Sequence, residues 1–525
     1  MSTPQPQAKP HEKPQLTIRW WPAIVILVLA AVVWFYIWFL QDIPRQAQNI
    51  QTAQLILATL ALLMTWVLLF SRMRWRRRFL LCGGVVGLAG LMAATLEIRG
   101  VTGDLIPVVE WRWSRPTSQR LSVEQPTGKS QSESLPIASP YDYPQLSGPN
   151  RISRLPGPQL ARDWKSQPPK LLWRRPIGTA WSGFAIAGQH AVTMEQRGES
   201  ELVTCYNLLT GDPIWTHADD SHFVSVIAGE GPRTVPTIAN GNVYSLGPSG
   251  ILNCLELTSG TLLWQKNIIT ENDASVNGWG ASCSPLVINE KVIVSAGGKE
   301  GRSLIAYDAS TGNEIWSQGD DRASYSSPVL AEIDGTTQIL IFNNPGVKSH
   351  DAQSGTVLWG YDWERGSSNI VMPVVLPEGR VLISSGYGIG SHLVQVSQDP
   401  PGTWSASPIW QSKRLKSKFA NIIVHDESIY GLDDGIFTCL ELVTGERRWK
   451  RGRYGHGQII LVGELLLVMA ENGDLVLLEP NPEEHRELSR FTVLNGKTWN
   501  PPALSDRVLL VRNDKEAACF ELPIE

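Results

Sequence analysis

The sequence is short of features that would point to a metal site, a disulfide framework or a nucleic-acid partner. Only six of its 525 residues are cysteine, and no CxxC or paired Cys/His spacing occurs, which argues against a zinc site and dense disulfides. The nine histidines show no His-x-His or His-x3-His pattern, so metal chemistry by histidine is not expected. The formal net charge of −4 is near neutral, and no strongly basic field predicts binding to nucleic acid.

Phosphate-binding and hydrolase signatures are also missing. No Gly-x-Ser-x-Gly or phosphate loop stands out, and SGYGIGS (385–391) lies between two predicted strands, which favours a hairpin turn over a phosphate cradle. The pairs Asp320-Asp321 and Asp433-Asp434 lack the spacing of a calcium loop. We therefore expect them to be solvated turn residues, and we predict no metal site.

Three long apolar runs, at 20–40, 53–70 and 79–96, contain no charged residue. A helix needs about 20 apolar residues to cross the hydrocarbon core of a bilayer. The runs therefore predict a three-helix membrane anchor over 20–98. Because none of them carries an ionisable residue, we expect an anchor and not an ion or proton path.

The positive charges beside these runs predict the orientation of the anchor. The loop between the second and third runs is rich in arginine, whereas the loop between the first and second holds only Arg45. Lysine and arginine favour the cytoplasmic side. We therefore expect residues 1–19 to be a cytoplasmic tail and everything after the third run to be extracytoplasmic, on the periplasmic side of the cytoplasmic (inner) membrane. The cations that carry this prediction are Lys9, Lys13, Arg19, Arg72, Arg74, Arg76, Arg77 and Arg78.

Residues 99–164 are expected to form a flexible extracytoplasmic tether. Between about 112 and 160 the chain is polar and contains proline and serine, with little to bury. The segment YDYPQLSGPNR (141–151) is richer in aromatics, and we expect it to be more ordered and to pack on the domain that follows.

The remainder, 165–525, repeats one unit of roughly 40 to 50 residues, the period and four-strand pattern of a propeller blade. Each unit begins with a small-Pro-apolar segment, continues with alternating strands and ends in Thr/Ser-Gly-x-x-x-Trp, as in TGNEIW (311–316). We predict an all-β, eight-bladed propeller of four-stranded antiparallel blades. The C-terminal strands of the last blade lack an outer strand, which LLWRRPI (171–177) is expected to supply, so that the two ends of the domain close the ring.

The repeated tryptophan is predicted to pack one blade on the next. The glycine before it supplies the positive φ of a tight turn, and an acidic or amide residue four positions before that glycine can bind backbone amides of the turn. A tryptophan on the outer strand can bury about 200 Å² against the neighbouring blade. The predicted docking residues are Trp173, Trp215, Trp264, Trp316, Trp359, Trp410 and Trp449, with Phe491 in the equivalent position of one further copy.

This pattern resembles the PQQ-like propeller repeat, whose blades end in Asp-x-x-Thr-Gly-x-x-x-Trp; YDASTGNEIW (307–316) matches it. Two kinds of protein share the repeat. The resemblance implies either a BamB-like, non-catalytic extracytoplasmic scaffold or a quinoprotein dehydrogenase that holds pyrroloquinoline quinone (PQQ) and calcium in the central funnel. It also extends to membrane-anchored members of the group.

The compact blades and the lack of an adjacent Cys-Cys pair favour the scaffold, with a protein partner and without a cofactor. The alternative is a PQQ-dependent oxidoreductase for alcohols or sugars, with PQQ and calcium. Either function is expected to use the funnel mouth, whose residues could also simply fill it. The candidates are Trp181, Ser182, Trp279, Ser282, Tyr325, Ser326, Asn369, Asn421, Trp499 and Asn500.

Overall fold

A computed structural model describes residues 18–114, 117–119, 121, 139–225, 227–364, 366, 368–400 and 402–525. The chain divides into two compact units, Met1–Ser114 and Arg115–Glu525. Most of the predicted cytoplasmic tail, and residues 115, 116, 120 and 122–138 of the predicted tether, lie outside the described residues.

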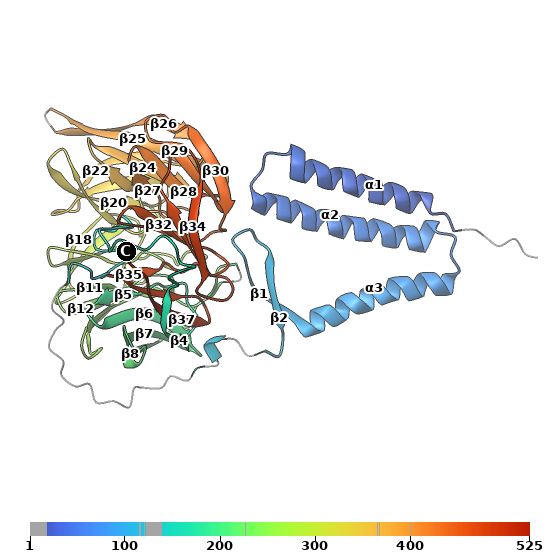
Figure 1. Cartoon of the computed structure of the whole chain (residues 1–525), viewed down its shortest axis with the longest axis horizontal. Helices are drawn as coiled ribbons and strands as arrows, with labels where there is room; N and C mark the ends of the chain where they lie inside the picture. Colours follow the sequence, from blue (N-terminus) through green and yellow to red (C-terminus); the bar gives the residue numbers. More distant parts are fainter. Residues whose placement is uncertain are drawn as a thin grey trace, which may run out of the picture. The chain divides into compact units, whose positions relative to one another are not determined.

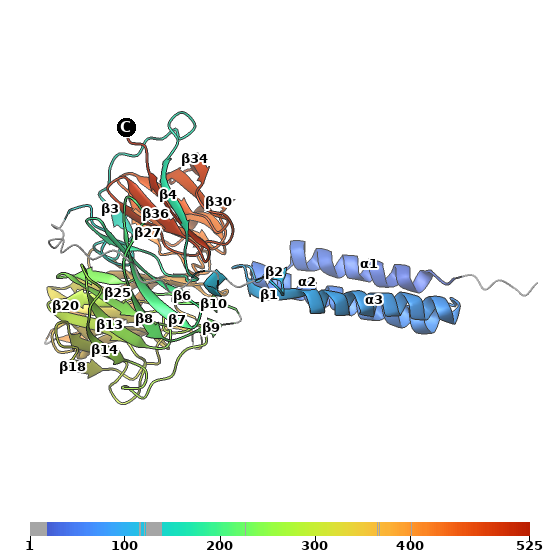
Figure 2. The ribbon, with the colours of Figure 1, turned by 90° about the horizontal axis from the view of Figure 1, so that it is seen from below.

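The first unit contains three helices that are long and apolar enough to span a membrane, as predicted: Trp21–Leu40, Arg45–Phe70 and Trp75–Thr95. Figures 1 and 2 show them side by side. The second helix begins at Arg45 and not near residue 53, because its first turns are polar and still helical. The segments are α1 (Trp21–Phe35), η1 (Tyr36–Leu40), α2 (Arg45–Thr65), η2 (Trp66–Phe70) and α3 (Trp75–Thr95).

A two-stranded antiparallel hairpin follows α3 without a loop. Its strands are β1 (Leu96–Val101) and β2 (Pro107–Trp111). The prediction placed the start of the tether here, at residue 99, so the first part of that segment is ordered as a sheet.

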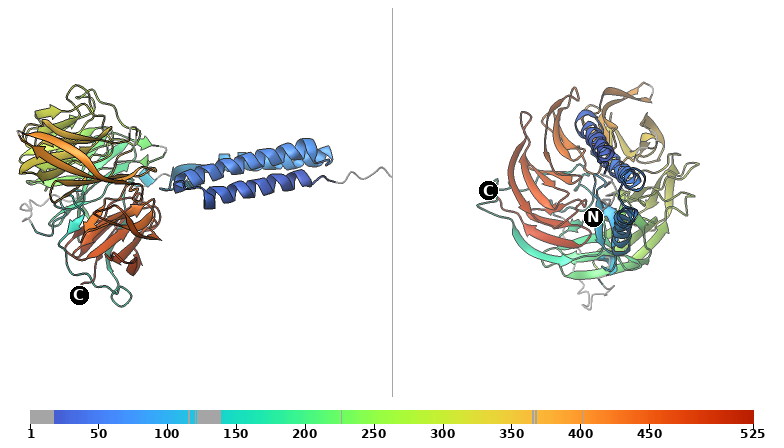
Figure 3. Two further views of the ribbon diagram at one scale, coloured as in Figure 1. Left: turned by 90° about the horizontal axis from the view of Figure 1, so that it is seen from above. Right: turned by 90° about the vertical axis from the view of Figure 1, so that its right-hand side faces the viewer.

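Within the described residues, the second unit contains eight sheets of four or five strands that fan out around a common axis (Figure 3, right), which confirms the predicted eight-bladed propeller. The first four blades, each listed from its innermost to its outermost strand, are β5 (Ala185–Ala187), β6 (His190–Arg197), β7 (Ser200–Asn207), β8 (Pro213–Asp220); β11 (Thr237–Ala239), β12 (Asn242–Leu246), β13 (Ile251–Glu256), β14 (Leu262–Asn267); β15 (Leu286–Ile288), β16 (Lys291–Ser295), β17 (Leu304–Asp308), β18 (Glu314–Gln318); and β19 (Val329–Ile333), β20 (Thr336–Phe342), β21 (Gly346–Asp351), β22 (Val357–Asp362).

The last four blades follow the same order: β23 (Val374–Leu376), β24 (Arg380–Ser385), β25 (Gly390–Asp399), β26 (Thr403–Ser412); β27 (Ile423–His425), β28 (Ser428–Asp433), β29 (Ile436–Glu441), β30 (Arg447–Arg453); β31 (Gln458–Val462), β32 (Leu465–Met469), β33 (Asp474–Glu479), β34 (Arg486–Thr492); and β35 (Ala503–Ser505), β36 (Val508–Arg512), β37 (Glu516–Glu521) with β4 (Lys170–Pro176). Smaller elements are η3 (Thr117–Gln119), β3 (Arg154–Leu155), β9 (Val224–Ser225) and β10 (Gly229–Glu230).

The two ends of the domain close the ring as predicted. Strand β4, from the start of the propeller, pairs antiparallel with β37, near the end of the chain, and becomes the outer strand of the eighth blade (Figure 1). Trp173 lies opposite Cys519 in this pairing, the same register that places Trp215 opposite Cys205 in the first blade. The eighth blade is therefore built like the others, although its strands come from opposite ends of the sequence.

Five of the seven docking tryptophans lie against a glycine in the last turn of the following blade. The Trp264 ring lies against Gly312, whose φ is +70°, and a Cβ added to this glycine would lie 2.8 Å from the indole. Any larger residue would therefore be strained in its backbone and would also collide with the ring. The same contact joins Trp173 to Gly211, Trp215 to Gly260, Trp316 to Gly355 and Trp410 to Gly445.

The indole nitrogen adds a hydrogen bond to most of these contacts. Trp264 Nε1 donates to the carbonyl of Ala309, at 3.0 Å, the residue after the turn-holding Asp308. Asp308 Oδ1 in turn accepts the amide of Thr311 at 2.8 Å and fixes the turn. Equivalent indole bonds run from Trp173 to Leu208, Trp215 to Leu257, Trp410 to Leu442 and Trp449 to Asn481.

Two blades lack this glycine. In the seventh blade the turn between β33 and β34 contains none, and Trp449 keeps only its hydrogen bond to the carbonyl of Asn481. The last hairpin of the fifth blade, between β25 and β26, has no Thr/Ser-Gly turn, so Trp359 of the fourth blade has no such glycine to meet. Its indole nitrogen donates instead to Gln338 Oε1, within its own blade, at 2.8 Å. At the position where phenylalanine replaces tryptophan, Phe491 packs edge-to-face on Phe520 of the eighth blade, with ring centroids 5.9 Å apart.

The cysteines of the propeller occupy small-residue positions beneath the tryptophans. Cys205, Cys254, Cys439 and Cys519 each lie on the third strand, directly opposite a docking tryptophan, and all four are buried and unpaired. In the third blade Ala306 lies opposite Trp316. A small side chain is needed here because the indole covers it.

Replacing Gly312 by alanine should destabilise the propeller through both strain and collision with Trp264. We expect a loss of about 3 kcal/mol in the free energy of unfolding, measured by denaturant titration. Gly335 is a matched control, because its φ of +71° is nearly the same and nothing lies within 4 Å of an added Cβ. Gly335→Ala should therefore cost only the backbone strain, about 1 kcal/mol. Equal losses in the two variants would contradict a docking role for the Trp264–Gly312 contact.

Candidate functional site

The predicted site residues all lie on one face of the propeller, where the innermost strand of each blade begins. We call this face the mouth. Trp181 and Ser182 precede β5, Trp279 and Ser282 precede β15, and Tyr325 and Ser326 precede β19. Asn369, Asn421 and the pair Trp499 and Asn500 precede β23, β27 and β35. Residues from six blades are thus placed at equivalent points around one axis.

The aromatic members meet in two clusters. Trp181 and Trp499 lie with ring centroids 4.9 Å apart, although they are far apart in the sequence. Trp279 stacks on Tyr325 with centroids 4.7 Å apart. Trp499, Trp279 and Tyr325 are half-buried, so each cluster offers part of its rings to a ligand.

The structure adds three residues that the sequence analysis missed. The rings of Phe419 and Trp499 have centroids 4.9 Å apart. Tyr387 extends the other cluster, with its ring centroid 6.2 Å from that of Trp279. Lys497 places its ammonium over the rings of both Trp181 and Trp499, at 4.3 and 4.2 Å. Phe419 stands two residues before Asn421 and Lys497 two residues before Trp499, so the alignment of the blades could have indicated both. Tyr387 lies in SGYGIGS, the predicted hairpin turn between β24 and β25.

The mouth carries positive charge beside the aromatic rings. Burial lowers the pKa of Lys497 to about 8, so its ammonium is still mostly charged at neutral pH. The Lys418 ammonium lies 5.4 Å from the Tyr387 ring and is itself buried. Glu471 holds the neighbouring side chains in place, since its carboxylate accepts Trp499 Nε1 at 2.9 Å and the His456 amide at 3.0 Å.

The amide and hydroxyl members of the predicted site are used inside the fold. Asn500 donates to the carbonyls of Ala180 and Ser182, and so joins the eighth blade to the first. Asn369 donates to the carbonyl of Asn343 and accepts the Ser385 hydroxyl. The hydroxyls of Ser182, Ser326 and Ser282 donate to the carbonyls of Thr234, Val371 and Gly280. These polar side chains use their hydrogen bonds to hold the starts of the blades in place. The aromatic rings are therefore the part of the predicted site that is available to a ligand.

Below the mouth, the axis of the propeller is occupied by the chain itself. We call residues 143–155 the axial segment. Its strand β3 pairs in parallel with β31, the innermost strand of the seventh blade, and Tyr143 forms a bridge with Ile186 in the first. The carbonyl of Pro144 accepts the Ile238 amide in the second blade. Part of the predicted tether therefore belongs to the propeller, because its backbone groups complete the inner edges of several blades.

Arg151 lies at the centre of these contacts and is 3% exposed. Its guanidinium donates to the carbonyls of Ser284 and Pro328, at 3.1 and 3.0 Å, and also bonds the carbonyl of Pro285 and the hydroxyl of Thr237. Burial lowers the pKa of Arg151 to about 10, which leaves the side chain charged at neutral pH. A single cation thus bridges the second, third and fourth blades with no carboxylate among these bonds.

One predicted solvated pair is in fact buried and neutralised by lysines. Asp433 is fully buried, with its carboxylate 2.6 Å from Lys416 Nζ and 2.5 Å from Lys450 Nζ. Asp434 lies 3.6 Å from Lys416 Nζ. The prediction failed because both lysines are 17 residues away in the sequence, where no local pattern links them to the turn.

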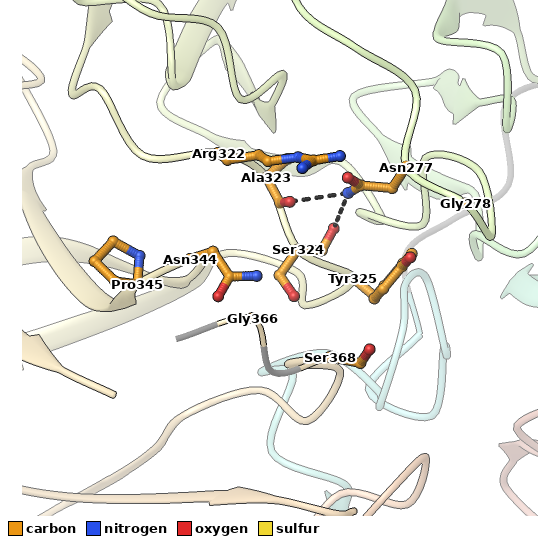
Figure 4. A pocket seen from close by; sticks show the side chains of 10 residues that line it. All are labelled: Asn277, Gly278, Arg322, Ala323, Ser324, Tyr325, Asn344, Pro345, Gly366 and Ser368. Atoms are coloured by element: carbon orange, nitrogen blue, oxygen red, sulfur yellow. Dashed lines mark hydrogen bonds between the residues drawn. The ribbon is translucent and has the colours of Figure 1, made fainter. Parts of the chain in front are cut away.

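A cavity of about 450 Å³ opens beside Tyr325 (Figure 4). On one wall Asn277 Nδ2 donates to the carbonyls of Ala323 and Ser324, at 2.9 and 3.2 Å. Arg322 also lines it. The cavity therefore continues the aromatic and cationic character of the mouth.

The comparisons with known proteins agree with the repeat and the ring of blades. Residues 199–451 match the family described as "Outer membrane protein assembly factor BamB". This match, together with the repeat and the fold, supports a PQQ-like β-propeller. No curated protein matches the chain.

Several solved structures are similar to this propeller. The quinohemoprotein alcohol dehydrogenase from Comamonas testosteroni is 12% identical, with a TM-score of 0.53 over 73% of this chain and 81% of that one. The quinohemoprotein alcohol dehydrogenase ADHIIG from Pseudomonas putida HK5 is 11% identical, with a TM-score of 0.50 over 74% and 83%. BamB from Moraxella catarrhalis is 14% identical, with a TM-score of 0.48 over 67% and 98%. At these identities the similarity shows the fold alone.

The residues on the axis do not suit a quinone with calcium. The axial segment fills the centre of the PQQ-like propeller, and its buried Arg151 places a positive charge there. Calcium prefers several oxygen ligands with negative charge. In the part of the chain that the structure describes, no three His, Cys, Asp or Glu side chains come together so that they could hold a metal ion.

Replacing Arg151 by alanine should loosen the axis of the propeller. The change leaves the carbonyls of Ser284 and Pro328 without their buried donor, and we expect the free energy of unfolding to fall by about 3 kcal/mol. Arg154→Ala is the matched control, since Arg154 lies in the same segment but is exposed. Denaturant titration of both variants provides the measurement. An Arg151→Ala protein as stable as Arg154→Ala would contradict the bridging role of Arg151.

Proposed function

We propose that this protein is a membrane-anchored, extracytoplasmic scaffold that binds another protein at the mouth of its propeller and catalyses no reaction. The observation that carries the proposal is the axial segment, which contacts the inner strands of several blades and places the buried Arg151 at the centre of the propeller. What remains accessible is the half-buried aromatic surface of the mouth, with Lys497.

The chemistry of the mouth suits a protein partner. Tryptophan, tyrosine and arginine contribute most often to the residues that dominate the affinity of protein interfaces. Trp279, Tyr325 and Trp499 supply large rings that are already held in place by stacking and hydrogen bonds, so little side-chain freedom is lost on binding. The positive charge of Lys497 and Arg322 favours a partner segment that carries carboxylates.

The anchor sets where such a scaffold would act. The arginines at 72–78 favour a cytoplasmic position for the loop between the second and third helices, which leaves the propeller on the extracytoplasmic side. A location in the cytoplasmic (inner) membrane with a periplasmic propeller, and a role in organising the envelope, are consistent with this orientation.

The competing function is that of a PQQ-dependent oxidoreductase, to which the aromatic mouth gives some support because flat cofactors also stack on rings. The two functions differ in one measurable property, the stoichiometric uptake of quinone.

A spectral titration of the full-length protein in detergent with PQQ and calcium should show no saturable change. A PQQ-dependent alcohol dehydrogenase treated in the same way serves as the positive control. Saturation at one quinone per chain would contradict the scaffold proposal and favour the oxidoreductase.

A second experiment tests for the protein partner directly, with a photo-crosslinking residue in place of Trp279. The matched control places the same residue at Ile315, on the exposed outer strand of the third blade. A scaffold that uses its mouth should give a discrete crosslinked protein from position 279 in cells and none from position 315. Crosslinks from both positions, or from 315 alone, would place the partner elsewhere.

A further inference from the structure

The hairpin that follows α3 has one apolar and one charged face. Residues directly opposite each other in an antiparallel pair share a face, and the faces alternate along each strand. Leu96 pairs with Trp111 and Ile98 with Val109, whereas Glu97 pairs with Glu110. One face therefore carries aliphatic and aromatic side chains, and the other carries two carboxylates.

The apolar face is uncovered. Ile98 is 61% exposed, Val109 50% and Trp111 55%, and the indole of Trp111 stacks on that of Trp113, which is 68% exposed. Among the described residues, β1 and β2 form a sheet of two strands and no third. A lone hairpin is marginal in water without a layer against its apolar face, so these side chains need a partner outside the sheet.

The hairpin is fixed at one end of the helical bundle. Strand β1 begins at the residue after α3 ends, and the Arg112 guanidinium donates to the carbonyl of Ala93 in the last turn of that helix, at 3.0 Å. At the turn of the hairpin, the carbonyls of Gly103 and Asp104 accept the side-chain amides of Gln46 and Asn49, at 2.8 and 2.7 Å. These bonds hold the hairpin beside the C-terminal end of α3 and the N-terminal end of α2.

At these two helix ends the spanning helices leave the hydrocarbon. Tryptophan pairs and snorkelling arginines are typical of the membrane–water interface, and Trp111, Arg112 and Trp113 follow each other here. Because β1 follows α3 directly and α3 also exposes apolar side chains, such as Leu91 and Met92, the partner that fits the apolar face is lipid.

We propose that the hairpin is an interfacial membrane anchor, whose apolar face (Leu96, Ile98, Val109 and Trp111) lies among the lipid headgroups and upper acyl chains while Glu97 and Glu110 face water. The bilayer is the one that α1, α2 and α3 span, so the inference rests on the membrane anchoring in the proposed function. Its consequence is that the chain leaves α3 along the membrane surface, and the hairpin is part of the anchor.

The test uses the full-length protein in phosphatidylcholine–phosphatidylglycerol vesicles, with an environment-sensitive fluorophore on one introduced cysteine. Val109→Cys reports the apolar face and Glu110→Cys, the next residue, reports the charged face. The six native cysteines are buried, and the unsubstituted chain measures their background labelling. Ile98→Cys repeats the test on the other strand.

We expect nitroxide attached high on the lipid acyl chain to quench the labels at 109 and 98, and aqueous iodide to quench the label at 110. Equal quenching by iodide at 109 and 110 would overturn the proposal. Protection of 109 from both quenchers would also overturn it, since the face would then be covered by protein, either a partner or a second copy of the chain.

Leu88→Cys, on the exposed surface of α3, separates failure of the hairpin from failure of the anchor. Quenching of this label by nitroxide deep in the acyl chain shows that α3 spans the bilayer, whatever happens at 109. If the Leu88→Cys label is open to iodide, the membrane anchoring itself is wrong and the proposal for the hairpin falls with it.

Discussion

The propeller depends on the contact between a tryptophan of one blade and a glycine of the next. A four-stranded blade cannot bury both of its faces alone, and the indole supplies the largest single apolar surface available for the interface. The glycine provides the positive φ of the turn and the room for the ring, and in most blades the indole nitrogen adds a hydrogen bond to the same turn. Where the turn is missing, in the fifth blade, Trp359 must find its hydrogen bond within its own sheet.

The axial segment provides a second set of contacts, at the inner strands of the blades. Docking at the outer strands leaves the inner strands with unpaired edges, and the axial segment meets these edges with its own backbone and with Arg151. Its contacts reach blades that are not neighbours in the ring. Each docking tryptophan holds one blade to the next. The axial segment instead contacts several blades at once and occupies the centre of the ring.

Much of the fold could be predicted from the sequence because its interactions repeat. The Asp-x-x-Thr-Gly-x-x-x-Trp pattern contains both the turn and the docking residue, and the missing outer strand of the last blade identified 171–177 as the closing strand. The axial segment could be foreseen only as an aromatic stretch that packs on the domain, because Arg151 bonds backbone carbonyls, which leave no trace in the sequence. The burial of Asp433 by two distant lysines was missed for a similar reason. At the mouth, the blade register identified the aromatic residues but not the use of Asn369 and Asn500 as fasteners within the fold.

The central claim is that the axial segment is a permanent part of the propeller, and hydrogen–deuterium exchange of the full-length protein tests it most directly. Backbone amides that are buried and hydrogen-bonded exchange only when the structure around them opens. The account predicts that residues 143–155 exchange as slowly as the innermost strands β5 and β31, and that an excess of PQQ and calcium leaves this protection unchanged. Rapid exchange of the segment, or loss of its protection when the quinone is added, would contradict the account.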